Sequence, residues 1–394
     1  MKKLIGTVAV AALLASAAFA EVNFGAWCNS VYFIGSNESG SVKHIFAQPW
    51  SADTTDTPRW LGLNAMGDSE HGGFLTEFQV NGKKLNFGQA FTYIKPIEQI
   101  QLIFGFTDQN YLRTDNLTFQ HDYTRPGAIK IGEGITFEEF EVGGIGLLVT
   151  PVESLKIFAG YDVPYLGKGA GDFQDDIGRT GKLGVAYTIG DIGTVKAGVR
   201  AQGKNYDKDG EEKDRVKVGV AFDLTAVDGL FVTVGAKIPL GGVYNEDLTR
   251  EPVNVAAGIG LNFIENLRIQ LNFNSKINAA KLEDGDVDGN FGFALELGAD
   301  YMFADGWTVF GAVGYASNVY NSTYKYDEDD AVFSGSTKDC LSFGVGIEKS
   351  WSNSKIGIEF VGATNYNTLL DSDGKKADGT GFSWLVPIKM NVSF

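Results

Sequence analysis

The chain of 394 residues contains 33 Lys and Arg against 49 Asp and Glu, which gives a formal net charge of −16. This acidic balance argues against nucleic acid as a partner, because a phosphate-binding surface must be basic. The two cysteines, Cys28 and Cys340, are too few in a chain of this length for a small disulfide-stapled scaffold, although one disulfide is conceivable. The mean hydropathy of −0.06 excludes a helical membrane protein but suits strands of which half the residues face water.

Residues 1–20 have the parts of a secretory signal peptide. Lys2 and Lys3 form a positive start, residues 4–19 are apolar or small, and residues 18–20 read Ala-Phe-Ala, a cleavage site. Cleavage would start the mature chain at Glu21, and we expect residues 21–394 to form one domain. No later stretch approaches the ~18–20 continuous apolar residues of a spanning helix. If the chain lies in a membrane, only a closed β-barrel can place it there.

Apolar and polar residues alternate over eighteen segments, and each segment predicts a β-strand. An even number of strands places both chain ends at the same end of a barrel. The predicted strands cover residues 22–34, 58–66, 73–80, 84–94, 98–107, 135–149, 154–162, 181–190, 194–201, 214–225, 230–238, 253–263, 267–274, 290–303, 307–316, 340–349, 355–363 and 382–394. Sixteen strands are the alternative, because two of the early segments are short.

A seven-residue phrase recurs along the chain at a spacing of roughly forty residues, which indicates a repeated structural unit. Each phrase joins two alternating segments through a tight turn and carries an acid at its third position. These acids are Glu98, Glu153, Asp191, Asp228, Glu265 and Asp305. Long polar stretches join the other strand ends, and short turns alternate with long loops in transmembrane barrels. A β-propeller has a similar repeat but needs four short strands in each, so the barrel is preferred.

The last predicted strand alternates up to the final residue, Phe394. Its apolar residues are Phe382, Trp384, Val386, Ile388, Met390, Val392 and Phe394. Here the chain resembles bacterial outer-membrane β-barrels of the porin-like family, whose last strand commonly ends in Phe. The resemblance implies an all-β, transmembrane, antiparallel up-and-down barrel with short periplasmic turns and long extracellular loops. It also implies that Phe394 serves as an assembly signal for the barrel assembly machinery.

If the apolar residues of each strand face lipid, the alternate residues line the lumen. This rule predicts ten charged pore-lining residues: Lys156, Lys196, Arg200, Lys217, Lys237, Arg268, Glu296, Asp300, Glu348 and Glu359. The bases come before the acids in the chain, so opposite walls of opposite charge would produce a field across the pore. Asp223 interrupts this separation, and the alternative is that charges simply occupy whichever face is wet.

The long predicted loops are acidic, which predicts a mild cation preference at the outer mouth, opposed by the basic residues inside. Residues 284–289, with the sequence Asp-Gly-Asp-Val-Asp-Gly, match the first half of a calcium-binding loop. The twelfth position is Leu295 where such a loop needs Glu, and a strand follows instead of a helix. A solvated acidic loop is therefore preferred to a calcium site, and no other cofactor is expected.

Nothing in the sequence points to catalysis. The histidines, His44, His71 and His121, fall in predicted connections, and no nucleophile elbow, metal-spaced His pair or phosphate loop is present. We therefore predict an outer-membrane channel for small hydrophilic solutes or ions, with membrane lipid as its surroundings and a homo-oligomer as one option. The alternatives are a selective transporter of hydrophobic compounds, with residues 35–56 folded inward, and a surface adhesin or structural protein.

Overall fold

The computed structural model describes most of the chain. The described residues are 22–36, 42–47, 60–81, 84–107, 111–112, 142–162, 180–206, 211–241, 251–277, 291–317, 323–326, 331–334, 339–364 and 382–394. The predicted signal peptide, the acidic segment 284–289 and His121 lie outside them. No helix among the described residues is long and apolar enough to cross a membrane.

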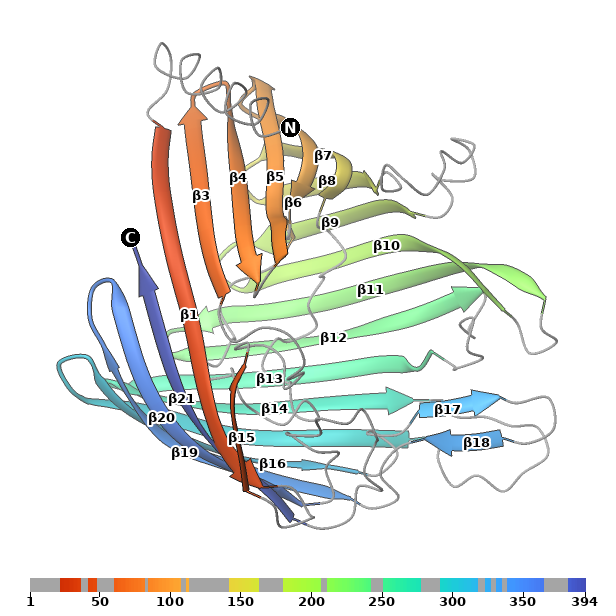
Figure 1. Cartoon of the computed structure of the whole chain (residues 1–394). Coiled ribbons are helices and arrows are strands. Elements are labelled where there is room, and N and C mark those ends of the chain that lie inside the picture. Colours follow the sequence, from red (N-terminus) through yellow and green to blue (C-terminus); the bar gives the residue numbers. More distant parts are fainter. Residues whose placement is uncertain are drawn as a thin grey trace.

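Eighteen long strands form one closed antiparallel barrel (Figure 1). They are β1 (Val22–Ser36), β3 (Trp60–Ser69), β4 (Gly72–Asn81), β5 (Lys84–Ile97), β6 (Ile100–Thr107), β7 (Val142–Val152), β8 (Leu155–Asp162), β9 (Gly181–Ile189), β10 (Gly193–Tyr206), β11 (Glu212–Val227), β12 (Leu230–Gly241), β13 (Val253–Ile264), β14 (Leu267–Ile277), β15 (Phe291–Ala304), β16 (Trp307–Ala316), β19 (Cys340–Ser350), β20 (Ser354–Thr364) and β21 (Phe382–Ser393). Each pairs with its neighbours along the chain.

The last strand closes the barrel against the first. β21 pairs with β1 from Trp384 opposite Ser36 to Ser393 opposite Trp27. Beyond the strand, the backbone N–H of Ala26 donates to the carbonyl of Phe394 at 2.9 Å, and the N–H of Phe394 donates to the carbonyl of Ala26 at 2.7 Å. The closing pair therefore has no open backbone edge, which a lipid environment requires.

All eighteen predicted strands are confirmed, and the sixteen-strand alternative is wrong because β3 and β4 are both fully paired. The largest boundary difference is at β7, which covers Val142–Val152 where 135–149 was predicted; residues 135–141 lie outside the described residues. At its other end β7 continues through Pro151, because a register shift between Val149 and Val152 keeps the pairing with β8.

Three short strands were not predicted, because four to six residues are too few to show a period. β2 (Val42–Ala47) pairs with residues 31–36 of β1. β3 pairs only with residues 22–29 of β1, so the rest of this edge has backbone groups that β2 satisfies. Residues 42–47, part of the stretch that the transporter alternative would fold inward, thus pair with β1 as a strand. β17 (Thr323–Tyr326) and β18 (Ala331–Ser334) form a hairpin within the connection from β16 to β19.

The two faces of the barrel differ as the alternation predicts. On β10, Val195 and Val199 are exposed, whereas Lys196 between them is only 4% exposed. The same apolar residues continue around the outer face, for example Leu183 on β9 and Val345 on β19. Exposed apolar side chains on every second residue are what a lipid-facing surface requires. We call the opposite face, which contains Lys196, the inner face.

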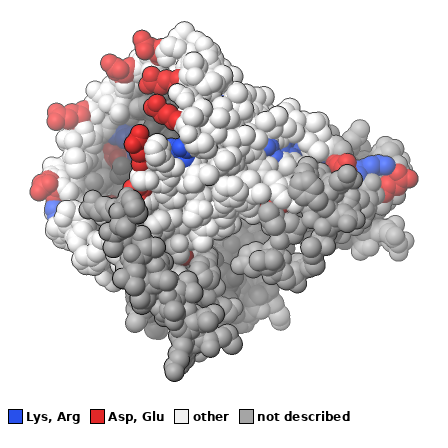
Figure 2. Space-filling model, turned by 90° about the horizontal axis from the view of Figure 1, so that it is seen from above, with Lys and Arg blue, Asp and Glu red and all other residues white. Residues whose placement is uncertain are grey.

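The recurring phrases form the tight turns at one end of the barrel. In three of these seven-residue repeats the residue directly after the acid has a positive φ. These residues are Gly229, Asn266 and Gly306, with φ values of 77°, 63° and 66°. Gly and Asn tolerate this left-handed conformation, which a two-residue turn requires. The acids of all six repeats are exposed. Figure 2 shows Asp and Glu side chains around a hollow at one end of the barrel.

Candidate functional site

Four cations form a cluster on the inner face of β9, β10 and β11. Lys182 lies directly opposite Arg200 in the pairing of β9 with β10, and Arg200 lies directly opposite Lys217 in the pairing of β10 with β11. Arg215 is two residues from Lys217 on the same face of β11. We call these four residues the basic row. Like charges directly opposite each other repel, so this row requires anions nearby.

Two carboxylates flank the basic row. The Asp162 side chain, at the end of β8, lies 2.7 Å from Lys182 Nζ and 3.6 Å from Arg200. Its other oxygen accepts a hydrogen bond from the Gly143 backbone N–H at 2.9 Å. On the other side of the row, Glu251, just before β13, forms ion pairs with Arg215 and, at 3.5 Å, with Lys217. Each carboxylate is therefore shared by two cations.

A second cation on β10 is fully neutralised. Lys196 Nζ lies 2.7 Å from Asp223 on β11, and the Thr233 hydroxyl on β12 donates to Asp223 at 2.5 Å. Lys196, Asp223 and Thr233 are 4%, 7% and 6% exposed. This buried group ties three adjacent strands together. It presents little charge to the lumen.

The acids of the later strands also pair locally. Arg268 on β14 donates to Asp300 on β15 at 2.8 Å. Lys389 on β21 lies 3.2 Å from Glu359 on β20, and Lys355 on β20 lies 3.8 Å from Glu348 on β19. The acidic sector therefore contains its own cations, and the basic sector contains Asp162 and Asp223. This local pairing favours neutralisation between adjacent strands over separate walls of opposite charge.

The three remaining predicted residues differ in environment. Lys156 is exposed on β8, on the inner face that Asp162 shares. Lys237 is partly exposed on β12, opposite Gly219. Glu296 on β15 is only 1% exposed and lies opposite Asn272, whose side-chain oxygen accepts a hydrogen bond from Gln270 at 3.0 Å. All ten predicted residues are on the inner face, but they form several separate groups.

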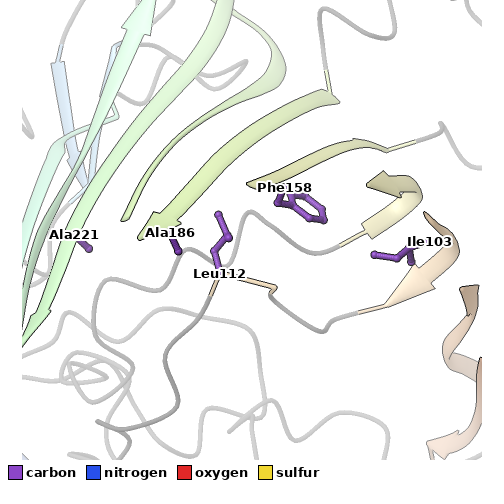
Figure 3. Close-up of a cluster of buried hydrophobic side chains, with 5 residues drawn as sticks. All are labelled: Ile103, Leu112, Phe158, Ala186 and Ala221. Atoms are coloured by element: carbon purple, nitrogen blue, oxygen red, sulfur yellow. The ribbon is translucent and has the colours of Figure 1, made fainter. Parts of the chain in front are cut away.

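An apolar patch also lies on the inner face, which the sequence did not predict (Figure 3). Ile103 on β6 and Phe158 on β8 have no exposed surface, and Leu112, from the connection between β6 and β7, is 2% exposed. Tyr111 stacks on Phe158 with ring centroids 5.6 Å apart and planes 9° apart. Burial raises the pKa of Tyr111 to about 12. The start of this connection is thus fixed against the inside of the barrel wall.

Sequence reasoning missed several partners of the predicted residues. Three of these partners, Lys182, Lys355 and Lys389, alternate with apolar residues, so the rule that alternate residues of a strand face the lumen could have predicted them. Asp162 is the last residue of its strand, where alternation predicts the direction of a side chain least well. Glu251 lies in a connection, and no sequence signal places it beside β11. Trp27 on β1 also donates from its indole to Glu77 on β4 at 3.1 Å, again on the inner face.

The residues considered for other chemistry do not form a cluster within the described part of the chain. His71 is exposed in the turn after β3, and the side chain of His44 on β2 is outside the described set. Cys28 and Cys340 are free thiols. No group of three or more His, Cys, Asp or Glu suited to a metal ion occurs among the described residues. Residues 284–289, for which a solvated acidic loop was preferred to a calcium site, lie outside the described residues.

No protein-family model and no curated protein matches this chain. Among solved structures, it is similar to in-vitro folded OmpT, an outer membrane protein of Vibrio cholerae, with 13% identity, a TM-score of 0.43 and coverage of 95% of this chain and 98% of that chain. The chain is also similar to a mutant Rh. blastica porin, with 9% identity, a TM-score of 0.48 and coverage of 95% of this chain and 100% of that chain. Salmonella typhi OmpF in complex with daunomycin is similar with 13% identity, a TM-score of 0.47 and coverage of 95% of this chain and 98% of that chain. Similarities at this level say nothing about the activity of this chain.

Proposed function

We propose that this chain is an outer-membrane channel through which small hydrophilic solutes and ions diffuse passively. The observation that carries the proposal is the closed eighteen-strand barrel with an apolar outer face and a charged inner face. A closed barrel leaves no backbone group unpaired in lipid, and a barrel of this size keeps a water-filled lumen. Charged side chains on the inner face are stable only where water or an ion partner reaches them.

The inner-face cations and anions would then line the diffusion path. This assignment covers Lys156, Lys196, Arg200, Lys217, Lys237, Arg268, Glu296, Asp300, Glu348 and Glu359. The apolar patch supports a limit on solute size, because Tyr111 and Leu112 occupy space inside the wall. We propose that Phe394, whose side chain is 81% exposed beside the β1–β21 closure, is the signal read by the assembly machinery.

A transporter of hydrophobic compounds is supported less well. Among the described residues, the apolar cluster on the inner face is the patch around Phe158, but Ile103 and Phe158 are already covered there, and Leu112 of the same chain packs against them. β2, within the segment that was considered as a plug, extends the sheet beside β1. An adhesin would depend on the long connections, most of which lie outside the described residues.

Single-channel recording of refolded protein in planar bilayers tests the proposal. We expect stepwise conductance that is proportional to bulk salt conductivity at high salt, as in a water-filled pore. Protein unfolded by boiling is the control for detergent artefacts. Folded protein is identified by its altered gel mobility before boiling. If folded protein gives no conductance steps, the channel is rejected and a structural role becomes the better hypothesis.

A further inference from the structure

We propose that Lys349, Trp307 and Trp351 form a binding site for an anionic phospholipid on the outer face of the barrel. The ligand chemistry is a phosphate-bearing headgroup joined to acyl chains. The inference goes beyond the proposed channel, because it concerns the lipid that surrounds the barrel and does not depend on conduction through the lumen.

The first argument is the direction of Lys349. On β19, Val345 is 54% exposed on the outer face, and Lys349 lies four residues later on the same face. It is directly opposite Trp307 of β16, which is also on the outer face. Every other Lys or Arg whose side chain the structure describes on the barrel strands follows the inward alternation of its strand, as Lys355 and Lys389 do. Lys349 is therefore the exception that needs a partner on the lipid side.

The second argument is the level at which the ammonium is held. Lys349 Nζ donates to the carbonyl of Asp305 in the tight turn between β15 and β16. It lies 5.7 Å from the centroid of the Trp307 ring and 5.7 Å from that of the Trp351 ring. A Cβ at Gly306 would lie 3.1 Å from Nζ, so the glycine keeps the space beside the ammonium open. The tight turns of outer-membrane barrels face the periplasm, which places this cation among the headgroups of the inner leaflet.

The third argument is the absence of an acidic partner within the described part of the chain. Lys355 and Lys389, on the two following strands, form ion pairs with Glu348 and Glu359. Lys349 forms no ion pair with a described carboxylate, and it uses one of its three N–H donors for a backbone carbonyl. A lipid phosphate would supply the anion, since the Lys ammonium binds phosphate as a compact point charge.

The fourth argument is the apolar surface that continues from Lys349 toward the middle of the barrel wall. Val309, two residues after Trp307, is 40% exposed, and Ile358 on β20 is 46% exposed. Both lie on the outer face with Val345, farther from the turn than the cation. A charge at the edge with an apolar surface beyond it matches the order of headgroup and acyl chains in one lipid molecule. A soluble phosphate would not use the apolar part.

Native mass spectrometry of the folded protein in mild detergent tests the site, because it resolves the binding of single lipid molecules. Phosphatidylglycerol and phosphatidylcholine with the same acyl chains are titrated in parallel. We expect the first phosphatidylglycerol to bind the parent more tightly than the first phosphatidylcholine. Glycerol 3-phosphate, which has the phosphate without the chains, forms the third arm and should not be retained.

The key variant is Lys349→Gln, which removes the charge from the outer face. It should weaken binding of the first phosphatidylglycerol about fivefold, the factor expected for one Lys at an anionic lipid surface. Lys156→Gln is the matched control, because it removes the same charge from the inner face and should keep the parental affinity. Lys349→Arg should retain the lipid. Trp351→Ala, which keeps the charge but removes one ring, should give a smaller loss.

Each outcome supports or overturns the site. Equal affinity of the parent for the two lipids would overturn it, and so would parental affinity in Lys349→Gln. An equal loss in Lys349→Gln and Lys156→Gln would assign the effect to net charge, again overturning it. Retention of glycerol 3-phosphate as tightly as phosphatidylglycerol would reject a lipid site in favour of a soluble anion. If Lys349→Gln does not fold, Trp351→Ala decides, and parental affinity there rejects the site. Folded protein without conductance would reject the proposed channel alone, because lipid binding is measured separately.

Discussion

The inner faces of β9–β11 and of β19–β21 carry similar charged residues in different ion-pair arrangements. On β19–β21, Glu348 pairs with Lys355 and Glu359 with Lys389, one cation for each acid. In the β9–β11 sector, the four cations of the basic row share two carboxylates from flanking segments. The comparison shows that the same types of charged residue pair in two ways. On β19–β21 each acid pairs with a cation of the barrel wall, whereas Asp162 and Glu251 reach the basic row from the end of β8 and from the residues just before β13.

The largest effect, on assembly of the barrel, should come from a change at the closure between β21 and β1. Deletion of Phe394 removes both backbone hydrogen bonds with Ala26 and the exposed phenyl ring. We expect strong loss of assembled barrel in outer-membrane fractions while export to the periplasm continues, measured by gel mobility with and without boiling. Phe394→Ala, which keeps the backbone bonds, separates the side-chain signal from closure. Equal amounts of folded protein in the deletion and the parent would contradict this role.

The next effect tests the faces of the β9–β11 sector. Val199→Arg places a cation on the outer face, at a cost of ~2–4 kcal/mol near the bilayer midplane. Gly198→Arg, one residue earlier, places the same group on the inner face between Lys196 and Arg200. We expect reduced folding into lipid vesicles only for the first variant. Equal folding of both would mean that the face assignment on β10 is wrong, and with it the location of the basic row.

A smaller effect should follow from removing one carboxylate of the β19–β21 sector. Glu359→Gln leaves Lys389 without its carboxylate while keeping the size of the side chain. We expect the free energy of unfolding to fall by about 1–3 kcal/mol, because the partly buried Lys389 ammonium exchanges a charged acceptor for the neutral oxygen of Gln. Urea unfolding in detergent measures this. The matched control is Glu153→Gln in an exposed tight turn, which should stay within about 0.5 kcal/mol of the parent.

The sequence predicted the barrel better than it predicted the charge pairs. Alternation alone located every long strand and placed Lys196 and Arg200 on one face, because the side-chain period of a strand is fixed at two. The partners depend on cross-strand register and on connections, which alternation does not encode. Glu251 reaches β11 from outside a strand, and Tyr111 packs on Phe158 from a connection. The acids of the repeated phrases were visible, but only the closed barrel shows that they gather at one mouth.

The smallest effect concerns ion selectivity, for which the sequence predicts mild cation preference from acidic loops that lie outside the described residues. Arg200→Gln should shift the reversal potential of a KCl gradient toward cations by a few millivolts at ~0.1 M salt, where the Debye length is ~10 Å. At ~1 M salt the length is ~3 Å, so the shift should nearly vanish. A Lys156→Gln variant, which loses one charge outside the row, controls for net charge alone. A shift of equal size in both variants at every salt concentration would contradict a distinct role for the basic row, because Arg200 lies among three other cations, Lys182, Lys217 and Arg215, and should act on passing ions more strongly than Lys156 outside the row.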